Sequence, residues 1–374
     1  MQSFWEKDLT HYEVAIVGAG IVGLSIAASL IEKNIKNILI LDRSVIPYGA
    51  STRNAGFACY GSLTEVLSDI KTMGADNARE LLFNRWMGLQ ITRKRLGEAG
   101  MEYESLGGYE LLENQVEARL DQMDAVNQLV SDFLPGYLRD ADDLKSELGI
   151  HSDGRLISID QEAQLNPALL LRSLEQYVTE NGATIRTGSH VKSLNDINDK
   201  IQIEVKDGSR KMITFSAGKV VVAVNGFAEE LIGNDLVKPG RGQVFITKPI
   251  PELKFKGNLH IEEGYYYFRN VGNRLLIGGA RNFDFQNEET TEIELNDKIQ
   301  SHLEHKSQEI FQLGDSFAVE MRWSGIMAFG NDKTPLVQRS GNNMYLALRM
   351  GGMGVALAGT IGEEVAEMIE EDGL

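Results

Sequence analysis

Three glycines near the start of the chain have the spacing of a phosphate-binding turn. Gly18, Gly20 and Gly23 stand between a β-branched apolar run and a stretch of helical character. In such a turn the first glycine permits a tight bend, the second lets the backbone approach a pyrophosphate, and the third lets helix and strand pack closely. Asp42 ends the next apolar run, about 20 residues on, where a carboxylate binds ribose hydroxyls and disfavours a 2′-phosphate. The pattern predicts a dinucleotide site.

A second glycine-rich turn precedes the last predicted helix. It reads Gly351-Gly352-Met353-Gly354 and could bring backbone amides and a helix N-terminus against a polar cofactor edge. In a flavin site such a dipole favours the negative charge that collects near N1 and O2 on reduction. Glycines suit an ordinary loop equally well, and NAD and FAD share the first fingerprint. The spacing alone therefore leaves the dinucleotide open.

Metal and nucleophile chemistry find little support in the sequence. Cys59 is the single cysteine, which excludes an intrachain disulfide framework and is typical of a reducing compartment. We interpret it as a small buried hydrophobe. The six histidines show no ligand spacing beyond His302 and His305, which fall on a charged helix that we expect to be exposed. We expect no metal site.

The composition is that of a globular protein large enough for two domains. The chain has 374 residues, of which 43% are hydrophobic and 24% charged. With 54 acidic against 37 basic residues, the net charge of −17 repels phosphate backbones, so we expect no nucleic-acid partner. The uncharged run from Val14 to Ile31 contains the three glycines and follows acidic residues, which argues against a signal peptide or membrane span. We expect a cytoplasmic protein without an integral membrane segment.

The elements that position these residues begin with a βαβ unit, which predicts an α/β fold. Its strands are expected at 12–17 and 37–41, and its helix at 21–33. Alternating strands over 243–279, with turns at 256–258 and 272–273, indicate an antiparallel sheet. With 7 prolines and no proline-rich linker, the domains are expected to be interleaved. Further helices are predicted at 64–100, 115–147, 169–181 and 355–370, and strands at 108–112, 184–186 and 219–224.

Further motifs stand between the two glycine turns. In order along the chain they are Gly49-Ala50-Ser51-Thr52-Arg53-Asn54-Ala55-Gly56-Phe57, Arg241-Gly242-Gln243-Val244 and Trp323-Ser324-Gly325. Together with the glycine turns they resemble the D-amino-acid oxidase (DAO) family of FAD-dependent oxidoreductases. Glycine oxidase, sarcosine oxidase and gamma-glutamylputrescine oxidase are similar members of it, and the likeness covers nearly the whole chain.

The resemblance implies a domain division and a tightly bound FAD. A Rossmann-like FAD-binding domain would comprise 1–60, 151–235 and 325–374, and an interleaved α+β substrate domain, built on the antiparallel sheet, 61–150 and 236–324. The glycine fingerprint would line the pyrophosphate, Asp42 and Arg43 the adenosine, and Val191 the adenine. The cofactor-binding positions that the resemblance implies are Gly18, Gly20, Ile21, Val22, Gly23, Asp42, Arg43, Ser51, Thr52, Arg53, Asn54, Ala55, Gly56, Phe57, Val191, Asn225, Gly226, Met350, Gly351, Gly352, Met353, Gly354 and Val355.

The substrate positions depart from the family. Relatives that oxidise amino acids carry an arginine, which clamps the substrate carboxylate, two residues after the glycine of the tryptophan motif; here that residue is Met327. Arg281 and Arg349 are candidates to replace it. With a turn near 271–273, an antiparallel register puts Tyr266 on the same sheet face as Arg281, and Tyr266 also matches a pocket tyrosine of the glycine oxidase branch. We therefore expect Tyr266, Arg281, Met327 and Arg349 in the substrate site.

The resemblance implies an enzyme that oxidises a small amine or amino acid to an imine, with hydride passing to flavin N5. No catalytic residue is assigned, because the cofactor carries the hard step and a neutral amine requires no base. Oxygen or a separate acceptor would take the electrons. Three alternatives stay open: a flavin-dependent 2-hydroxy-acid dehydrogenase, a catalytically silent flavoprotein subunit or sensor, and an NAD-only dehydrogenase.

Overall fold

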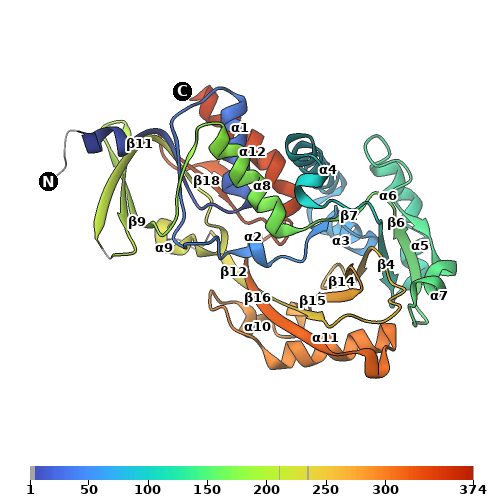
Figure 1. The fold of residues 1–374 in the computed structure, drawn as a ribbon. Helices are drawn as coiled ribbons and strands as arrows, with labels where there is room; N and C mark the ends of the chain where they lie inside the picture. Colours follow the sequence, from blue (N-terminus) through green and yellow to red (C-terminus); the bar gives the residue numbers. More distant parts are fainter. Residues whose placement is uncertain (1–4, 210, 234–235, 374) are drawn as a thin grey trace.

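The computed structural model describes residues 5–209, 211–233 and 236–373, which form two eight-stranded sheets and one two-stranded sheet (Figure 1). The first large sheet is built around β1 (His11–Val17), which leads into the glycine fingerprint. It pairs in parallel with β2 (Ile38–Leu41) and β11 (Met212–Val222). The other strands of this sheet are β8 (Thr184–Arg186), β9 (His190–Ile197), β10 (Lys200–Lys206), β17 (Leu336–Arg339) and β18 (Met344–Leu348).

Both faces of β1 are covered, which explains its uninterrupted apolar sequence. Val14 and Ile16 point into a core shared with the helices, whereas Ala15 and Val17 pack with residues of β9 and β10 on the opposite face. The helices α1 (Ile21–Glu32), α8 (Pro167–Glu180) and α12 (Gly354–Glu371) lie together over the first face (Figure 1). Because β1, β2, β11 and β18 are parallel, their carboxyl ends lie at the same edge of the sheet, where the turns that follow them can form a site.

The second large sheet follows the order β16-β12-β15-β14-β13-β4-β6-β5, and its neighbouring strands are antiparallel except for β4 and β13. Helix α11 (Asp297–Phe311) packs on it through a second core that includes Ile299 and Leu303. The strands are β4 (Gly108–Leu112), β5 (Arg139–Asp140), β6 (Arg155–Ile159), β12 (Lys238–Thr247), β13 (Asn258–Ile261), β14 (Tyr266–Val271), β15 (Arg274–Gly279) and β16 (Val319–Phe329).

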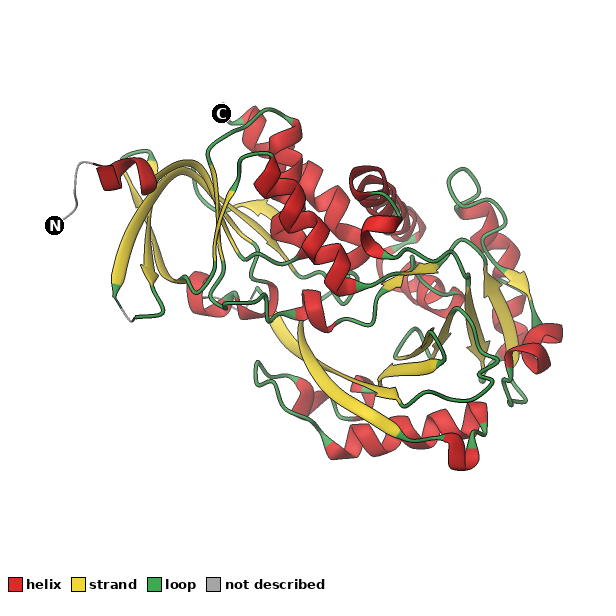
Figure 2. Cartoon of the chain, in the orientation of Figure 1, coloured by secondary structure: helices red, strands yellow, loops and turns green. Residues whose placement is uncertain are grey.

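The remaining elements are short, apart from α3 (Leu63–Met73) and α4 (Ala75–Leu96). Figure 2 shows the helices and strands in the same orientation. None of the described helices combines the length and apolar character that a membrane span requires. The short elements are η1 (Trp5–Leu9), α2 (Ala50–Arg53), β3 (Phe57–Ala58), η2 (Ala99–Met101), α5 (Val116–Leu120), α6 (Met123–Leu129), η3 (Asp142–Leu144), α7 (Lys145–Leu148), β7 (Ala163–Gln164), η4 (Asn225–Phe227), α9 (Glu229–Ile232), η5 (Arg281–Phe283), α10 (Phe285–Glu288) and η6 (Gly314–Ser316).

The predicted α/β fold class is confirmed, but two elements cross the predicted domain boundaries. Strand β6 falls in the segment 151–235, yet it pairs with β4 and so belongs to the second sheet. Helix α4 falls in the segment 61–150, yet it packs on α12 beside the first sheet. Both elements pack across the boundaries that the resemblance implies, because the order of segments along the chain does not determine which partner an element packs on.

The crossing of α4 and α12 depends on two glycines. A Cβ on Gly88 would collide with the carbonyl oxygen of Ala356, and a Cβ on Gly359 would collide with the carbonyl oxygen of Gly88. The two helix backbones are therefore in direct contact. Gly88→Ala should destabilise the protein by about 1–3 kcal/mol, although alanine is the better helix former, because the helices must separate. Thermal unfolding measures this, and Gly208→Ala, at a glycine with no atom within 4 Å of its added Cβ, is the matched control.

Candidate functional site

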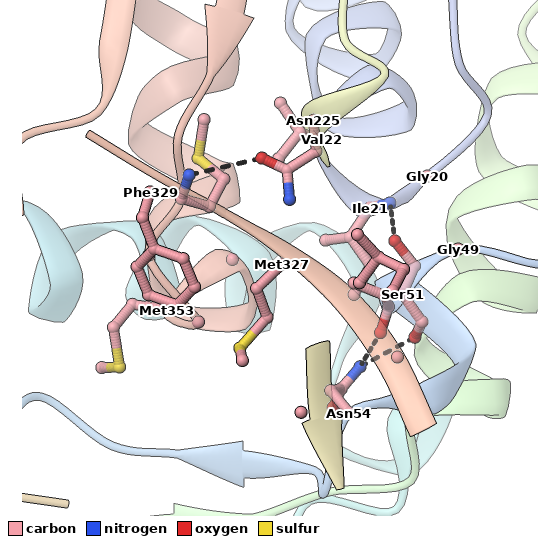
Figure 3. A pocket seen from close by; sticks show the side chains of 18 of the residues that line it. Gly20, Ile21, Val22, Gly49, Ser51, Asn54, Asn225, Met327, Phe329 and Met353 are labelled. Carbon is pink, nitrogen blue, oxygen red and sulfur yellow. Dashed lines mark hydrogen bonds between the residues drawn. The ribbon is translucent and has the colours of Figure 1, made fainter. Parts of the chain in front are cut away.

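A cavity of about 770 Å³ is lined by residues of both large sheets. One part is formed by the glycine fingerprint, the end of β2 and the segment 47–57. Another is formed by β12, β16 and the turn before α12 (Figure 3). The lining residues come from distant parts of the chain, because their turns meet at the edge where the strands of the first sheet end.

The glycine fingerprint is a close backbone approach. Gly18 has φ of 112°, a conformation that favours glycine, and a Cβ there would lie 2.6 Å from the carbonyl oxygen of Ala223. A Cβ on Gly23 would collide with the carbonyl oxygen of Gly18. A Cβ on Gly20 would lie 2.9 Å from Ser51 Oγ. Each glycine therefore lets neighbouring protein atoms approach more closely than a side chain would allow, which is the close packing that a pyrophosphate-binding turn requires.

Asp42 stands at the end of β2 and faces the same cavity. Its Oδ2 accepts a hydrogen bond from the Ala19 amide at 3.0 Å, and its Oδ1 accepts one from the Ser44 amide at 2.9 Å. The carboxylate thus fixes the glycine turn and keeps lone pairs for further donors. Beside it, the Arg43 guanidinium lies over the Phe227 ring at 3.8 Å from the centroid, which gives the cavity a flat cationic wall.

The segment around α2 is tied to both ends of the cavity. Ser51 Oγ accepts from the Ile21 amide at 2.9 Å, at the start of α1 (Figure 3). Asn54 Nδ2 donates to the Ser51 carbonyl oxygen at 2.8 Å. On the other side, Trp323 Nε1 donates to the Arg53 carbonyl oxygen at 2.9 Å. This segment therefore joins the first sheet to β16 along the length of the cavity.

The turn before α12 needs glycine and leaves a helix end without a side-chain cap. Gly351 and Gly352 have φ of 54° and 85°, where side chains are disfavoured. No side chain caps the α12 N-terminus from its N-cap residue, Met353. The Met350 amide donates to Asn225 Oδ1 at 3.5 Å (Figure 3). The first amides of α12 thus present a positive dipole end to the cavity.

Most predicted cofactor positions line this cavity, and three do not. Gly23 packs helix on strand, Thr52 Oγ1 donates to the Pro47 carbonyl oxygen at 2.9 Å, and Gly226 packs on the backbone of Met327. In the structure these three residues support the turns of the cavity wall, and their direct contact with a cofactor stays a prediction. The predicted positions that line the cavity are Gly18, Gly20, Ile21, Val22, Asp42, Arg43, Ser51, Arg53, Asn54, Ala55, Gly56, Phe57, Val191, Asn225, Met350, Gly351, Gly352, Met353, Gly354 and Val355.

Arg281 lines the cavity as an unpaired cation. Its guanidinium lies over the rings of Phe329, at 3.9 Å, and Phe285, at 4.8 Å. No carboxylate oxygen of the described residues lies within 4.0 Å of it. Burial lowers the pKa of Arg281, because the apolar surroundings disfavour its charge. Met327 lines the same cavity.

Tyr266 and Arg349 lie outside the cavity, contrary to expectation. Tyr266 is buried in the second core, where its hydroxyl bonds His302 Nε2 at 2.9 Å. The register places it opposite Gly279, as alternation predicts, but β15 ends there, and Ala280, with φ of 57°, turns the chain so that Arg281 leaves the sheet. Arg349 instead donates to Asp332 at 3.2 Å.

Several residues of the cavity wall were not foreseen. Tyr265 and Tyr267 face it in place of Tyr266, and Glu65 faces it from α3. Burial raises the pKa of Glu65, but Arg85 and Lys333 outweigh it and lower the pKa to about 2. Period-two alternation could have identified Tyr265 and Tyr267 as the opposite face to Tyr266. Nothing local in the sequence links Glu65 to Lys333.

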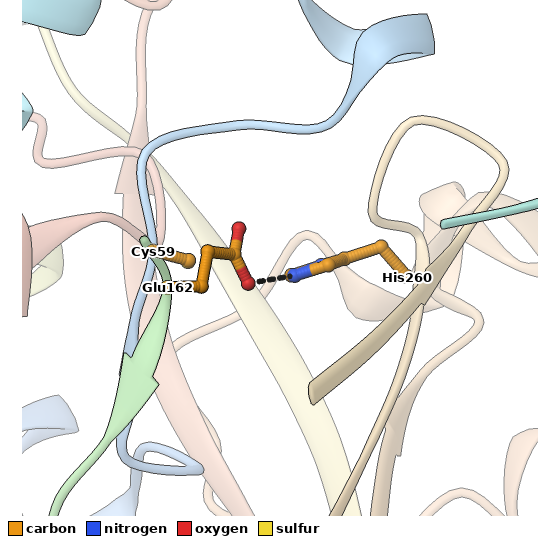
Figure 4. Close-up of side chains that lie close together, drawn as sticks. All are labelled: Cys59, Glu162 and His260. Carbon is orange, nitrogen blue, oxygen red and sulfur yellow. Dashed lines mark hydrogen bonds and ion pairs between the residues drawn. The ribbon is translucent and has the colours of Figure 1, made fainter. Parts of the chain in front are cut away.

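Cys59, Glu162 and His260 form a buried cluster at the wall of the cavity. Their ligand atoms lie within 4.8 Å of one another, and Glu162 Oε2 bonds His260 Nε2 at 2.8 Å (Figure 4). Burial raises the pKa of the Cys59 thiol, so the expectation of a small buried side chain agrees with its position. The sequence missed the cluster because its members stand in three separate segments. The absence of a metal site stays a prediction.

The cavity and its glycine turns together fit a dinucleotide, and the family comparison gives the class of protein. Residues 13–368 match the DAO family of FAD-dependent oxidoreductases. The chain belongs to this family, so its cofactor is FAD and the NAD-only alternative is set aside.

Particular relatives cover almost the whole chain. It is 25% identical to the probable oxidoreductase OrdL of Haemophilus influenzae, over 98% of this chain and 84% of that protein. It is 23% identical to gamma-glutamylputrescine oxidoreductase of Escherichia coli, over 96% and 84%. Among solved structures, L-proline dehydrogenase from P. horikoshii has a TM-score of 0.78 at 19% identity, with 97% and 94% covered. Glycine oxidase from Geobacillus kaustophilus has a TM-score of 0.75 at 20% identity, with 97% and 95% covered.

Removing the Asp42 carboxylate should weaken FAD binding. In Asp42→Ala the Ala19 amide loses its acceptor and the ribose loses a charged partner, so we expect the Kd of FAD to rise by about ten- to a hundredfold. Titration of FAD into the apoprotein, followed by flavin fluorescence, measures this. Asp207→Asn, in the exposed turn after β10, is the control; equal affinity in Asp42→Ala and the control would remove Asp42 from the cofactor site.

Proposed function

We propose that this enzyme oxidises a small amine or amino acid to an imine, with hydride transferred from the carbon beside nitrogen to the flavin. The observation that carries the proposal is the unpaired Arg281 guanidinium in the cavity that holds the cofactor turns. Such a cation suits a substrate carboxylate, which accepts two parallel hydrogen bonds from it. The printed activities of similar proteins, among them glycine oxidase and gamma-glutamylputrescine oxidoreductase, support the same class.

The residues present fit an FAD in one orientation. The Gly18 to Val22 turn would hold the pyrophosphate, Asp42 the adenosine ribose, and Arg43 with Val191 the adenine end. The segment 51–57 and the α12 N-terminus would hold the isoalloxazine, whose reduced form gains negative charge beside the helix dipole. When bound, FAD supplies the hydride acceptor.

The chain itself supplies orientation and a dry pocket. Arg281 would hold the carboxylate, and its position between Phe285 and Phe329 keeps the guanidinium plane fixed. Tyr265 contacts Phe285 edge-on, with centroids 5.9 Å apart, and extends this aromatic wall. Met327 adds an apolar surface without charge. Together these side chains exclude water from the reacting carbon and favour one pose.

Two alternatives from the sequence make different predictions. A 2-hydroxy-acid dehydrogenase would also use Arg281, because its substrate carries the same carboxylate. A silent flavoprotein would reduce with dithionite but with no substrate. Anaerobic bleaching of the flavin by a panel of amines, amino acids and hydroxy acids separates the three, and reduction by hydroxy acids alone would contradict our proposal. Oxygen consumption during turnover then tests whether oxygen is the acceptor.

Arg281→Met should separate substrates by their charge. For amines that carry a carboxylate we expect KM to rise by about ten- to a hundredfold, because a charged hydrogen-bonded pair is lost. Amines without a carboxylate serve as the control within the same variant and should keep their KM. FAD content, read from the visible spectrum, should not change. An unchanged KM for amino acids would remove Arg281 from the substrate site.

A further inference from the structure

His260 is a buried histidine on the wall of the cavity, and its ring is held by a single carboxylate. It is 6% exposed, lies on β13 and is among the residues that line the cavity. Its ring meets Phe57 edge-on, with centroids 5.4 Å apart, and Phe57 ends the segment expected to lie under the flavin. The imidazole therefore stands beside the region where substrate and flavin would meet.

Glu162 determines which nitrogen of His260 carries the proton. The carboxylate is completely buried and its Oε2 lies 2.8 Å from His260 Nε2 (Figure 4). An ionised carboxylate only accepts hydrogen bonds, so Nε2 donates. Asn258 Nδ2 donates to the same Oε2 at 3.2 Å and fixes the carboxylate in place. The neutral imidazole is thereby held with its proton on Nε2, and the lone pair lies on Nδ1.

Nδ1 has no hydrogen-bond partner among the side chains and backbone of the described residues, and the ring lines the cavity. A ring nitrogen with a free lone pair, opposite a nitrogen fixed by a buried carboxylate, has the arrangement of a general base with its orienting group. Cys59, Glu162 and His260 could alternatively bind a metal ion. In the structure, however, His260 Nε2 is hydrogen-bonded directly to Glu162.

The chemistry of amine oxidation requires such an acceptor. An alkyl ammonium, like that of lysine, has a pKa of about 10.4, so only about one molecule in 2,500 is neutral at pH 7. The ammonium cannot give up hydride from the neighbouring carbon until the nitrogen has a lone pair to form the imine. An enzyme that takes the charged form of its substrate gains from a base beside the nitrogen.

We propose that Nδ1 of His260 accepts the proton that the substrate ammonium loses before hydride transfer, with Glu162 as its positioning residue. This rests on the proposed amine oxidation. One N–H bond of the ammonium breaks, its electron pair stays on the amine nitrogen, and one N–H bond forms at Nδ1. The positive charge moves to the imidazolium, where Glu162 stabilises it. No electrons leave the substrate in this step.

The surroundings of His260 suit it to this task. Burial alone lowers the pKa of His260, but the Glu162 carboxylate and its hydrogen bond, with the more distant charges of Glu110 and Glu65, raise it above the ordinary value. A raised pKa makes the neutral ring a stronger proton acceptor. The titratable groups that face it are Glu162, Glu110, which stands opposite it on β4, Tyr267 on β14, Cys59 after β3 and Glu65 on α3.

The pH dependence of kcat/KM for an amine that reduces the flavin tests the proposal. The wild-type profile should rise as His260 loses its proton. In His260→Gln this rise should be absent. kcat/KM should instead increase only at higher pH, as the free amine itself loses its proton, and at pH 7 it should be lower by about a hundredfold. In Glu162→Gln the rise should move to lower pH, because the pKa of His260 falls without the carboxylate. His305→Gln, at an exposed histidine of α11, should keep the wild-type profile.

A second measurement does not depend on turnover. Long-range ¹H–¹⁵N spectra of the FAD-loaded protein labelled at histidine should show one resonance, absent in His260→Gln, with the proton on Nε2 and a pKa above that of an ordinary imidazole. Glu162→Gln should lower that pKa. A proton on Nδ1, or an unchanged kcat/KM profile in His260→Gln, would overturn the dyad while leaving amine oxidation intact.

Two further results would also decide against it. Stoichiometric zinc in the purified protein, lost in both Cys59→Ala and His260→Gln, would make the cluster a metal site. Failure of every amine to bleach the flavin would overturn the proposed function and the base with it, and is distinguished from failure of the dyad alone by the bleaching panel.

Discussion

The close contact of backbone with backbone at the glycine fingerprint is the constraint on which the rest of the structure depends. Gly23 lies against Gly18, and Gly18 against Ala223, so α1, β1 and β11 meet with no side chain between them. Asp42 and Ser51 then bond to amides of this same turn. A bulkier residue would push these elements apart. The turn that lines this end of the cavity therefore depends on the contacts that the glycines allow.

Buried charge around the cavity follows one rule, with an informative exception. Burying an ion is costly unless a partner compensates it, and the buried ions here have partners. Arg241 donates to both oxygens of Glu288, at 2.9 and 2.8 Å, and Arg269 donates to the carbonyl oxygens of Gly56 and Leu165. Arg241 thereby anchors α10, the element that follows the turn of Arg281. Arg281 has aromatic rings instead of an anion, which is the arrangement expected when the anion is the substrate.

The two proposals place different demands on the same pocket. Recognition of a carboxylate needs a fixed cation, whereas removal of a proton needs a neutral lone pair on a ring that a carboxylate holds from its other nitrogen. The structure separates these tasks between two elements of the second sheet: the turn after β15 carries Arg281, and β13 carries His260. The Glu162 carboxylate and the Arg281 guanidinium therefore form no ion pair with each other.

Local pattern predicted the parts of the site that depend on one stretch of chain. The glycine spacing and Asp42 predicted residues that the structure brings together in the wall of one cavity, because a βαβ unit fixes them within about 30 positions. The alternation of side chains predicted which residues of β14 and β15 share a face of the sheet. It did not predict which face lines the cavity, nor that the backbone at Ala280 would turn Arg281 out of the sheet. A left-handed backbone at an alanine has no signature in composition.

The sequence by itself determined the fold class and, through the family resemblance, the FAD cofactor. Only the tertiary structure placed Arg281 in the wall of the cavity, and it alone brought Glu162 to His260. The reason is physical. A helical pattern or a glycine turn depends on residues that are close in the sequence, whereas a buried pair such as Glu162 and His260 forms only when segments far apart in the sequence pack together. Which partners meet there depends on the packing of the whole chain.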